Sequence, residues 1–84
     1  MNLSFKAKAW DQYQFRAEND KAIFRKINRL IEECLRRPFD GTGKPDPLKG
    51  DLSGWWSRRI DREHRLVYRV EGDILVIAQC RYHY

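Results

Sequence analysis

The run Arg81-Tyr82-His83-Tyr84 brings together residue types that can act on a phosphate diester. An imidazole titrates at about pH 6.5, so it can give a proton to a leaving oxygen at working pH. A neighbouring guanidinium can stabilise the negative charge that develops on phosphoryl oxygens. His83 is therefore a candidate proton-transfer group, flanked by a cation and two phenols.

An apolar run over residues 74–78 directly precedes this group and is typical of a β-strand. Chain ends usually fray, so a side chain at such a position can do chemistry only where another element holds it. The strand predicts that His83 is held.

The spacing of turns predicts how arginines meet on the sheet. If a first hairpin turns about Arg62, Arg59 lies opposite Arg65. Like charges directly opposite destabilise a sheet, and a fold tolerates them best where an anion or an acidic residue sits between them. If a second hairpin turns about Gly72, Arg65 lies near Gln79.

Alternation along a strand then predicts that Gln79, Arg81 and His83 share one face. Two arginines and a histidine would converge near one end of the sheet. The alternative is that the arginines of this half coat a solvated face and pair with Asp61 and Glu63; those arginines are Arg58, Arg59, Arg62, Arg65 and Arg69. His64 is interpreted as a turn residue without a special role.

The two adjacent tryptophans predict one side chain toward the core and one exposed or packed under a loop. Trp55 and Trp56 are neighbours, so strand alternation separates them. An exposed tryptophan beside arginines could stack on a base, although core packing is the commoner role.

Two helices are expected before the sheet. Leu3 and Phe5 alternate with polar residues and predict a short first strand. A first helix follows, with Trp10, Tyr13 and Ala17 on its apolar face. Asn19-Asp20 is expected to supply a turn and the N-cap of a second helix, which Pro38 ends. That helix has the strongest periodic pattern: Ile23, Ile27, Leu30, Ile31, Cys34 and Leu35.

Residues 38–54 are interpreted as a loop because prolines and glycines gather there. From Trp55 onward the pattern predicts an antiparallel meander with a turn at Glu71-Gly72-Asp73. Residues 1–84 are thus expected to form a small single α+β domain, with two N-terminal helices packed on one face of a mostly antiparallel, twisted sheet.

Composition narrows the function classes. The chain has 84 residues, 42% hydrophobic, and a net charge of +5, which favours an anionic partner such as nucleic acid. Gly41-Thr42-Gly43-Lys44 lacks the length and following Ser/Thr of a phosphate-binding P-loop. No Cys/His cluster has metal-ligand spacing, no apolar run is long enough for a membrane span, and no secretory signal is visible.

The two cysteines, Cys34 and Cys80, each sit among apolar neighbours. Buried free thiols are favoured over a disulfide, and free thiols indicate a cytoplasmic location.

Several long motifs resemble the YoeB-type toxins of the RelE/ParE toxin–antitoxin superfamily. Residues 43–60 carry the first motif, and residues 63–68 with Arg81-Tyr82-His83-Tyr84 carry the second. The early stretch of residues 9–13 and the helical stretch of residues 26–31 also match that family's pattern. The resemblance covers essentially the whole chain and implies a RelE-like, microbial-RNase-like fold.

The resemblance implies a ribosome-dependent mRNA endoribonuclease that cuts mRNA in the ribosomal A site and so inhibits translation. Such toxins use the RNA 2′-hydroxyl as nucleophile without a metal or other cofactor. It also implies a cognate YefM-type antitoxin and a homodimer. The family's catalytic positions fall on Asp46, Arg65, His83 and Tyr84, and its substrate-binding positions fall on Lys49 and Arg59.

One position departs from the family pattern: Asp46 stands where the family usually has a glutamate general base. Aspartate is one methylene shorter, and a small misplacement can reduce a rate about 100-fold. An alternative is therefore a non-cleaving protein that blocks the ribosomal decoding site. A third hypothesis is a DNA gyrase inhibitor of the ParE branch, but such an inhibitor has no evident need of Arg65 or of His83-Tyr84.

Overall fold

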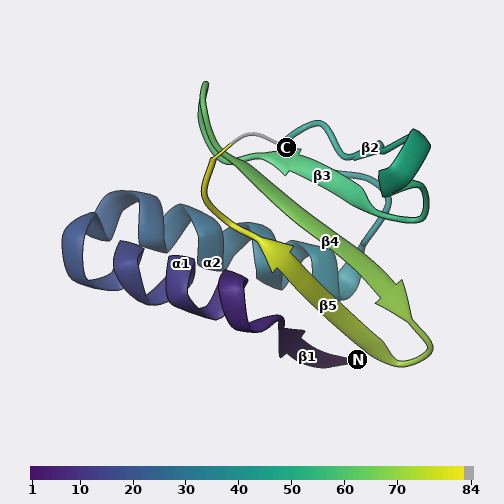
Figure 1. Cartoon of the computed structure of the whole chain (residues 1–84), viewed down its shortest axis with the longest axis horizontal. Coiled ribbons are helices and arrows are strands. Elements are labelled where there is room, and N and C mark those ends of the chain that lie inside the picture. The colour runs from purple at the N-terminus through teal and green to yellow at the C-terminus, as the bar shows by residue number, and fades with distance from the viewer. Residues whose placement is uncertain (83–84) are drawn as a thin grey trace.

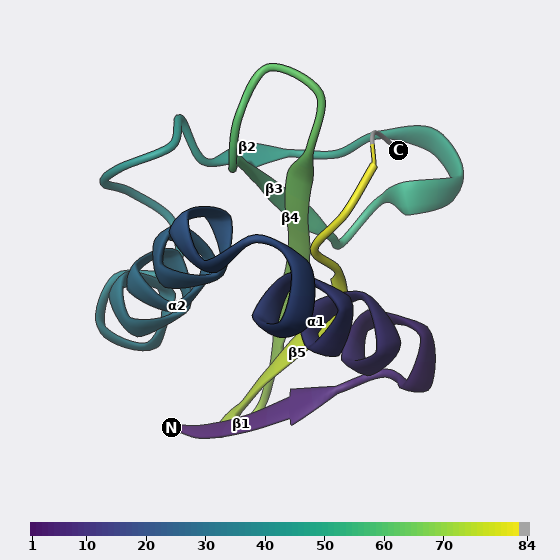
Figure 2. The same ribbon diagram turned by 90° about the vertical axis from the view of Figure 1, so that its left-hand side faces the viewer.

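The computed structural model describes residues 1–82, in which two helices cover one face of a five-stranded sheet (Figures 1 and 2). His83 and Tyr84 lie outside the described residues. In chain order the elements are β1 (Asn2–Phe5), α1 (Ala7–Asn19), α2 (Lys21–Arg36), β2 (Asp46–Pro47), the 3-10 helix η1 (Gly50–Leu52), β3 (Trp56–Arg59), β4 (Arg65–Glu71) and β5 (Ile74–Gln79).

The sheet has the strand order β1-β5-β4-β3-β2. β2, β3, β4 and β5 pair antiparallel in sequence, and only β1 is parallel, beside β5. Both helices lie on the same side of the strands (Figure 2). The predicted α+β class, with helices on one face of a mostly antiparallel sheet, is therefore confirmed.

The α2 helix supplies the helical half of the core, as its periodicity predicts. Its buried side chains are those of Ile27, Leu30, Ile31 and Cys34. Burying an aliphatic side chain of this size contributes roughly 1.5–3 kcal/mol. The Asp20 side chain accepts a hydrogen bond from Ile23 N at 3.1 Å, which confirms the predicted N-cap.

The buried stripe of α1 is shifted by one position along the helix from the predicted one. Ala9, Gln12 and Arg16 are buried, whereas Trp10 is 45% exposed and Tyr13 is half-buried. The Trp10 ring stacks on Tyr13 with centroids 5.7 Å apart, at the side of the helix next to β1. The aromatic rings thus pack on one another, and the polar residues take the buried stripe.

A hydrogen bond of Gln12 explains why this polar residue occupies the buried stripe of α1. The Gln12 Oε1 atom accepts a hydrogen bond from Cys80 N at 2.9 Å, where β5 has ended. Cys34 and Cys80 are both free and buried, as predicted. Burial raises the pKa of Cys34 to about 11 and that of Cys80 to about 12, because the thiolate is poorly solvated there.

The second hairpin has a different register from the predicted one. Glu71 pairs with Ile74, and an irregularity at Val67/Tyr68 places Gln79 opposite Val67 instead of near Arg65. The two-residue turn shifts the pairing by one residue from the predicted register, and the bulge shifts it by one more. The predicted strand register is therefore wrong, although Arg65 N and Gln79 Nε2 both donate to the carbonyl oxygen of Tyr82.

The segment from 38 to 54 is not a loop throughout. Asp46 and Pro47 form the edge strand β2 and pair with Ser57 and Trp56, and η1 follows. Pro47 lacks an N–H group, which an edge strand tolerates. The short strand fixes the backbone of Asp46 against β3.

Candidate functional site

Three of the predicted site residues share the face of the sheet that is turned away from the helices. Arg59 and Arg65 are direct partners on β3 and β4, as predicted. Asp46 is the partner of Ser57, which precedes Arg59 by two positions on β3. Because cross-strand partners and alternate residues point to the same face, Asp46, Arg59 and Arg65 project on one side.

The opposite side of β3 belongs to the core. Arg58 and Tyr68 are fully buried there, next to the side chains of α2. With the strands about 4.8 Å apart and an offset of two residues along them, the backbone positions of Asp46 on β2 and Arg65 on β4 are roughly 12 Å apart. Side chains that extend toward each other from both positions can reach one phosphate and its sugar.

Lys49, Arg59 and Arg65 have no carboxylate partner within residues 1–82, whereas Arg69 on the same face pairs with Glu71. Asp46, Lys49 and Arg59 are exposed, and Arg65 is half-buried. No carboxylate in this range lies within 4.0 Å of the charged nitrogens of Lys49, Arg59 or Arg65. Their charge is therefore available to an anionic ligand.

The Arg65 guanidinium is fixed by the hairpin that precedes it. Its Nη1 atom donates hydrogen bonds to the carbonyl oxygens of Asp61 at 2.9 Å and of His64 at 3.1 Å. Two carbonyl partners hold the side chain without neutralising it. Arg65 is thus the best-positioned cation of the group, because a guanidinium has further donors for a phosphate.

Lys49 comes from a turn instead of from the sheet. It directly precedes η1, and its carbonyl oxygen accepts a hydrogen bond from Leu52 N at 3.2 Å. The turn lies in the connection that joins β2, which carries Asp46, to β3. The structure does not bring Lys49 into contact with Arg59 or Arg65.

Trp55 extends the basic face. The Arg69 guanidinium carbon lies 4.4 Å from the centre of its ring system, and Lys6 Nζ lies 5.0 Å from it. Cations on a tryptophan face gain roughly 0.5–1 kcal/mol at exposed sites. Trp56 instead packs against the core and against Phe39, with centroids 4.8 Å apart. The predicted separation of the two tryptophans is confirmed.

The segment after β5 returns to Arg65 and to His64. Tyr82 O accepts hydrogen bonds from Arg65 N at 3.0 Å and from Gln79 Nε2 at 2.8 Å. Tyr82 N donates to His64 Nδ1 at 2.6 Å. His64 is thus more than a turn residue, contrary to the prediction. The predicted catalytic residues His83 and Tyr84 follow Tyr82 in the chain and lie outside the described residues.

Arg81 does not share a face with Gln79. β5 ends at Gln79, so strand alternation does not continue beyond it. The Arg81 guanidinium carbon lies 3.6 Å from the centre of the Phe15 ring on α1 and 4.7 Å from that of Tyr82. The expected grouping of Gln79 and Arg81 on one face is wrong because the strand stops before Arg81.

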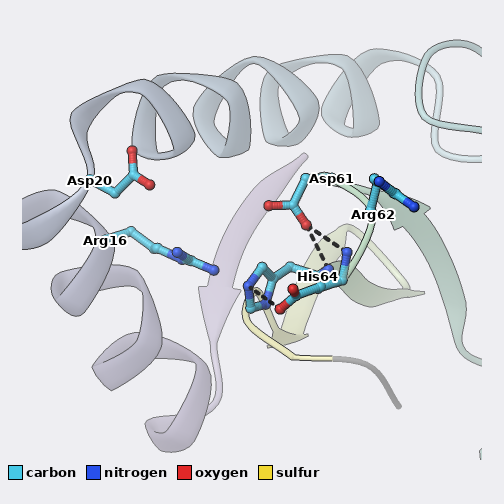
Figure 3. Close-up of a pocket in the computed structure, with 6 residues that line it drawn as sticks. Arg16, Asp20, Asp61, Arg62 and His64 are labelled. Carbon is cyan, nitrogen blue, oxygen red and sulfur yellow. Dashed lines mark hydrogen bonds and ion pairs between the residues drawn. The ribbon is translucent and has the colours of Figure 1, made fainter.

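A cavity of about 340 Å³ lies beside His64 and has a mixed charge (Figure 3). Its lining residues are Arg16, Asp20, Asp61, Arg62, Glu63 and His64. Burial alone would raise the pKa of Asp61, but hydrogen bonds from the backbone of His64 and Glu63 hold it below its usual value. Arg16 is 7% exposed, and its Nε and Nη2 atoms have no hydrogen-bond partner within residues 1–82.

Arg58 is the residue that the sequence interpretation misplaced most. Its side chain is fully buried instead of coating a solvated face. Nη1 donates to Thr42 O at 3.1 Å, Nη2 donates to Asp40 O at 2.8 Å and to Arg37 O, and Nε donates to Tyr68 Oη at 3.2 Å. Nη1 also lies 3.3 Å from Glu33 Oε1 on α2.

The contacts of the buried Arg58 side chain connect the loop after α2 to the sheet. Tyr68 Oη in turn donates to Pro38 O at 2.6 Å. A signal for it was present in the sequence, because Arg58 lies between Trp56 and Ile60 at the inward position of the strand. The Arg58 contacts hold the first part of the segment between α2 and β2, and β2 carries Asp46.

Neither a metal centre nor a membrane span is seen in the part of the chain that the structure describes. No three or more His, Cys, Asp and Glu side chains of residues 1–82 are grouped so that they could hold a metal ion. None of the helices in that range has the length and apolar character needed to cross a membrane.

The fold places the chain in a class of small α+β domains whose members can share this fold at very low sequence identity. YafQ from E. coli has this fold, with a TM-score of 0.78 at 13% identity over 98% of this chain and 92% of YafQ. Within that class, a family model described as "YoeB-like toxin of bacterial type II toxin-antitoxin system" matches residues 5–84. The chain belongs to this YoeB-like toxin family.

Relatives with high identity cover the full chain. Toxin YoeB of Escherichia coli K12 is 57% identical and that of Streptomyces coelicolor is 56% identical, each over 100% of both chains. The YoeB/ParE toxin from Agrobacterium tumefaciens superposes with a TM-score of 0.98 at 51% identity, covering 100% of both chains. YoeB in the heterotetrameric YoeB–YefM complex from Staphylococcus aureus gives 0.92 at 44% identity, with 100% and 98% covered.

Proposed function

We propose that this toxin is a ribosome-dependent mRNA endoribonuclease that cuts mRNA in the ribosomal A site and so inhibits translation. The observation that carries the proposal is the direct pairing of Arg59 with Arg65 on the face that also presents Asp46. Two guanidinium groups without a carboxylate partner among residues 1–82, on the same face as one carboxylate, suit a phosphate diester, because the cations bind the phosphate and the carboxylate can take a proton.

The proposed reaction is an internal transfer at phosphorus. The Asp46 carboxylate removes the proton of the RNA 2′-hydroxyl, and the 2′-oxygen forms a bond to phosphorus. The bond from phosphorus to the 5′-oxygen then breaks, and protonated His83 gives its proton to that oxygen. The products are a 2′,3′-cyclic phosphate and a 5′-hydroxyl, with Asp46 protonated and His83 neutral.

The cations stabilise the charge that this step concentrates on phosphorus. Arg65 faces the phosphoryl oxygens and contributes most, because its guanidinium is already positioned by two carbonyl groups. Lys49 and Arg59 bind the substrate backbone, and Tyr84 orients the substrate. Both proton transfers are assigned to side chains, so the proposed reaction is independent of a metal ion.

The comparisons support partners of two kinds. One solved relative is a heterotetrameric YoeB–YefM complex and another is a YoeB dimer, both from Staphylococcus aureus. We extend both to this chain and propose a YefM-type antitoxin and a homodimer. An acidic antitoxin segment that covers the face of Arg59 and Arg65 would neutralise the groups that bind RNA. The ribosomal substrate places the toxin in the cytoplasm.

Primer extension on a defined mRNA tests the proposal. The purified chain is added with and without ribosomes programmed on that message. We expect a new 5′ end at the A-site codon only when ribosomes are present, and no change with EDTA at a concentration that leaves ribosomes intact. Ribosome binding without a cut would overturn the nuclease proposal and favour a non-cleaving inhibitor of translation.

A further inference from the structure

The backbone of Tyr82 is held at both of its polar groups. Its N–H group donates to His64 Nδ1 at 2.6 Å. Its carbonyl oxygen accepts from Arg65 N at 3.0 Å and from Gln79 Nε2 at 2.8 Å. Because β5 has already ended at Gln79, these contacts and not the sheet ladder fix this part of the chain.

Tyr82 also has an unusual backbone conformation. Its φ angle is 69°, in the left-handed region that side chains with a Cβ atom rarely adopt. Such a conformation persists only where surrounding contacts determine it, and it often marks a functional site. Tyr82 is 53% exposed, so burial of its side chain does not account for this conformation. The backbone contacts do.

His64 is itself firmly placed. Its backbone N–H donates to Asp61 Oδ1 at 2.8 Å, and its carbonyl oxygen accepts from Ile60 N at 3.0 Å and from Arg65 Nη1 at 3.1 Å. The His64 side chain is only 16% exposed. Figure 3 shows Arg16 extending from α1 toward this imidazole, on the other side from the hairpin.

The contact with Tyr82 defines which form of the imidazole is present. A nitrogen that accepts a hydrogen bond carries no proton, so Nδ1 must be bare and the proton of the neutral ring sits on Nε2. Nε2 lies 3.9 Å from Glu63 Oε2, on the side away from Tyr82. The other groups that line the same cavity are Arg16, Asp20, Asp61 and Arg62.

We propose that His64 is a positioning residue for the cleavage reaction. By accepting the Tyr82 N–H, it holds the backbone of Tyr82, the residue that directly precedes His83 in the chain. The inference rests on the proposed function, in which His83 is the proton donor. His64 acts through Tyr82 and does not contact the RNA. Arg65 links Tyr82 to the substrate site: its backbone N–H donates to Tyr82 O, and its side chain binds phosphate in the proposed reaction.

Three substitutions separate positioning from a general structural role. In His64→Asn the Oδ1 atom occupies the place of Nδ1, so the acceptor for Tyr82 N–H is retained. In His64→Gln the amide group lies further out, near the place of Nε2, and the acceptor is lost, as it is in His64→Ala. Asparagine and glutamine thus form a matched pair that differs in where the acceptor sits.

We expect His64→Ala and His64→Gln to lower kcat for ribosome-dependent cleavage about 10- to 100-fold, with KM for programmed ribosomes nearly unchanged. His64→Asn should stay within a few-fold of wild type. Amide hydrogen exchange should show faster exchange at Tyr82 N–H in the first two variants only. Equal loss in all three variants, or full activity in His64→Ala, would overturn the proposal.

A measurement on the unmodified chain covers the case in which the variants fail to fold. An N–H···N hydrogen bond transmits a scalar coupling between its two nitrogens, so ¹⁵N NMR should detect coupling between Tyr82 N and His64 Nδ1. Its absence would overturn the proposal. If the coupling is present but the wild-type chain does not cut mRNA, the proposed function fails, and with it the catalytic consequence of the contact.

Discussion

Arg59 on β3 and Arg65 on β4 face each other directly across the sheet, with Asp46 on the same face. Like charges at this position lower the stability of the sheet by a fraction of a kcal/mol. An anion bound between the two guanidinium groups would offset this repulsion. Stability and ligand binding therefore oppose each other at this pair.

Replacing one cation of the pair should separate these two effects. We expect Arg59→Gln to raise the free energy of unfolding by about 0.5 kcal/mol, because the repulsion is removed. The same change should raise KM for programmed ribosomes about tenfold or more, since a charge-assisted hydrogen bond contributes about 1.5–3 kcal/mol. Urea denaturation and cleavage kinetics measure the two quantities. Arg62→Gln in the exposed turn is the control and should change neither by much.

The neighbouring arginine should respond in the opposite direction. Arg58→Gln removes a fully buried cation from Glu33 and from three loop carbonyl groups. We expect the free energy of unfolding to fall by about 3 kcal/mol, as when one partner of a buried ion pair is deleted. Urea denaturation beside Arg59→Gln gives the matched comparison. A fall in the free energy of unfolding below about 1 kcal/mol would show that the loop keeps its structure without the Arg58 contacts.

The length of the acid at position 46 can be tested directly. Asp46→Glu should keep or raise the cleavage rate, because the longer side chain reaches further from a backbone that β2 fixes at the sheet edge. Asp46→Asn should lower kcat on the order of 100-fold or more, since the base is lost. Single-turnover cleavage on programmed ribosomes measures both. A large loss in Asp46→Glu would show that the site is shaped around the shorter acid.

His83 should act in the transition state alone. We expect His83→Ala to lower kcat at least 100-fold while the affinity for ribosomes stays nearly unchanged. Cosedimentation with ribosomes and primer extension measure the two separately. If affinity for the ribosome falls together with activity, His83 is a contact residue and the proton donor lies elsewhere.

The buried thiols predict a loss of stability at alkaline pH. Unfolded thiols ionise near the reference value of 9.0, whereas burial holds the pKa of Cys34 at about 11 and of Cys80 at about 12. Their raised values stabilise the fold fully below pH 9, and this contribution is lost as pH rises to the folded values. At pH 10.5 the loss is on the order of 2 kcal/mol for each thiol.

The cysteine-free double variant provides the comparison. Cys34→Ala with Cys80→Ala should show a smaller fall in the urea midpoint between pH 8 and pH 10.5 than the wild-type chain does. Lysines and tyrosines titrate in both proteins, so the difference between the two isolates the thiols. Parallel curves would contradict the role assigned to burial.

Elements governed by local pattern were predictable from the sequence. The stripe of α2, the Asp20 cap and the first hairpin follow from periodicity and turn spacing, and so does the pairing of Arg59 with Arg65. The α1 stripe was not predictable, because its polar residue Gln12 is buried by a hydrogen bond to Cys80, far away in sequence. No local propensity encodes such a partner.

The site was predictable in part for the same reason. The face shared by Asp46, Arg59 and Arg65 depends on cross-strand pairing, and a short edge strand at Asp46 has too few residues to show alternation. The role of His64 depends on Tyr82, which reaches it only after β5 has ended. The bulge between Val67 and Tyr68 shifts the strand register and so changes which residues meet beyond the end of β5, and no turn residue in the sequence predicts this bulge.

The parallel pairing of β1 with β5 has a consequence for the nascent chain. Asn2 lies beside Ile74, so β1 can join the sheet only after β5 is available. Pairing between strands this far apart in sequence forms late in folding. β3, β4 and β5 instead pair with strands that are their neighbours in sequence. The cationic pair of Arg59 and Arg65 therefore belongs to a local hairpin that can form before β1 adds the parallel edge strand.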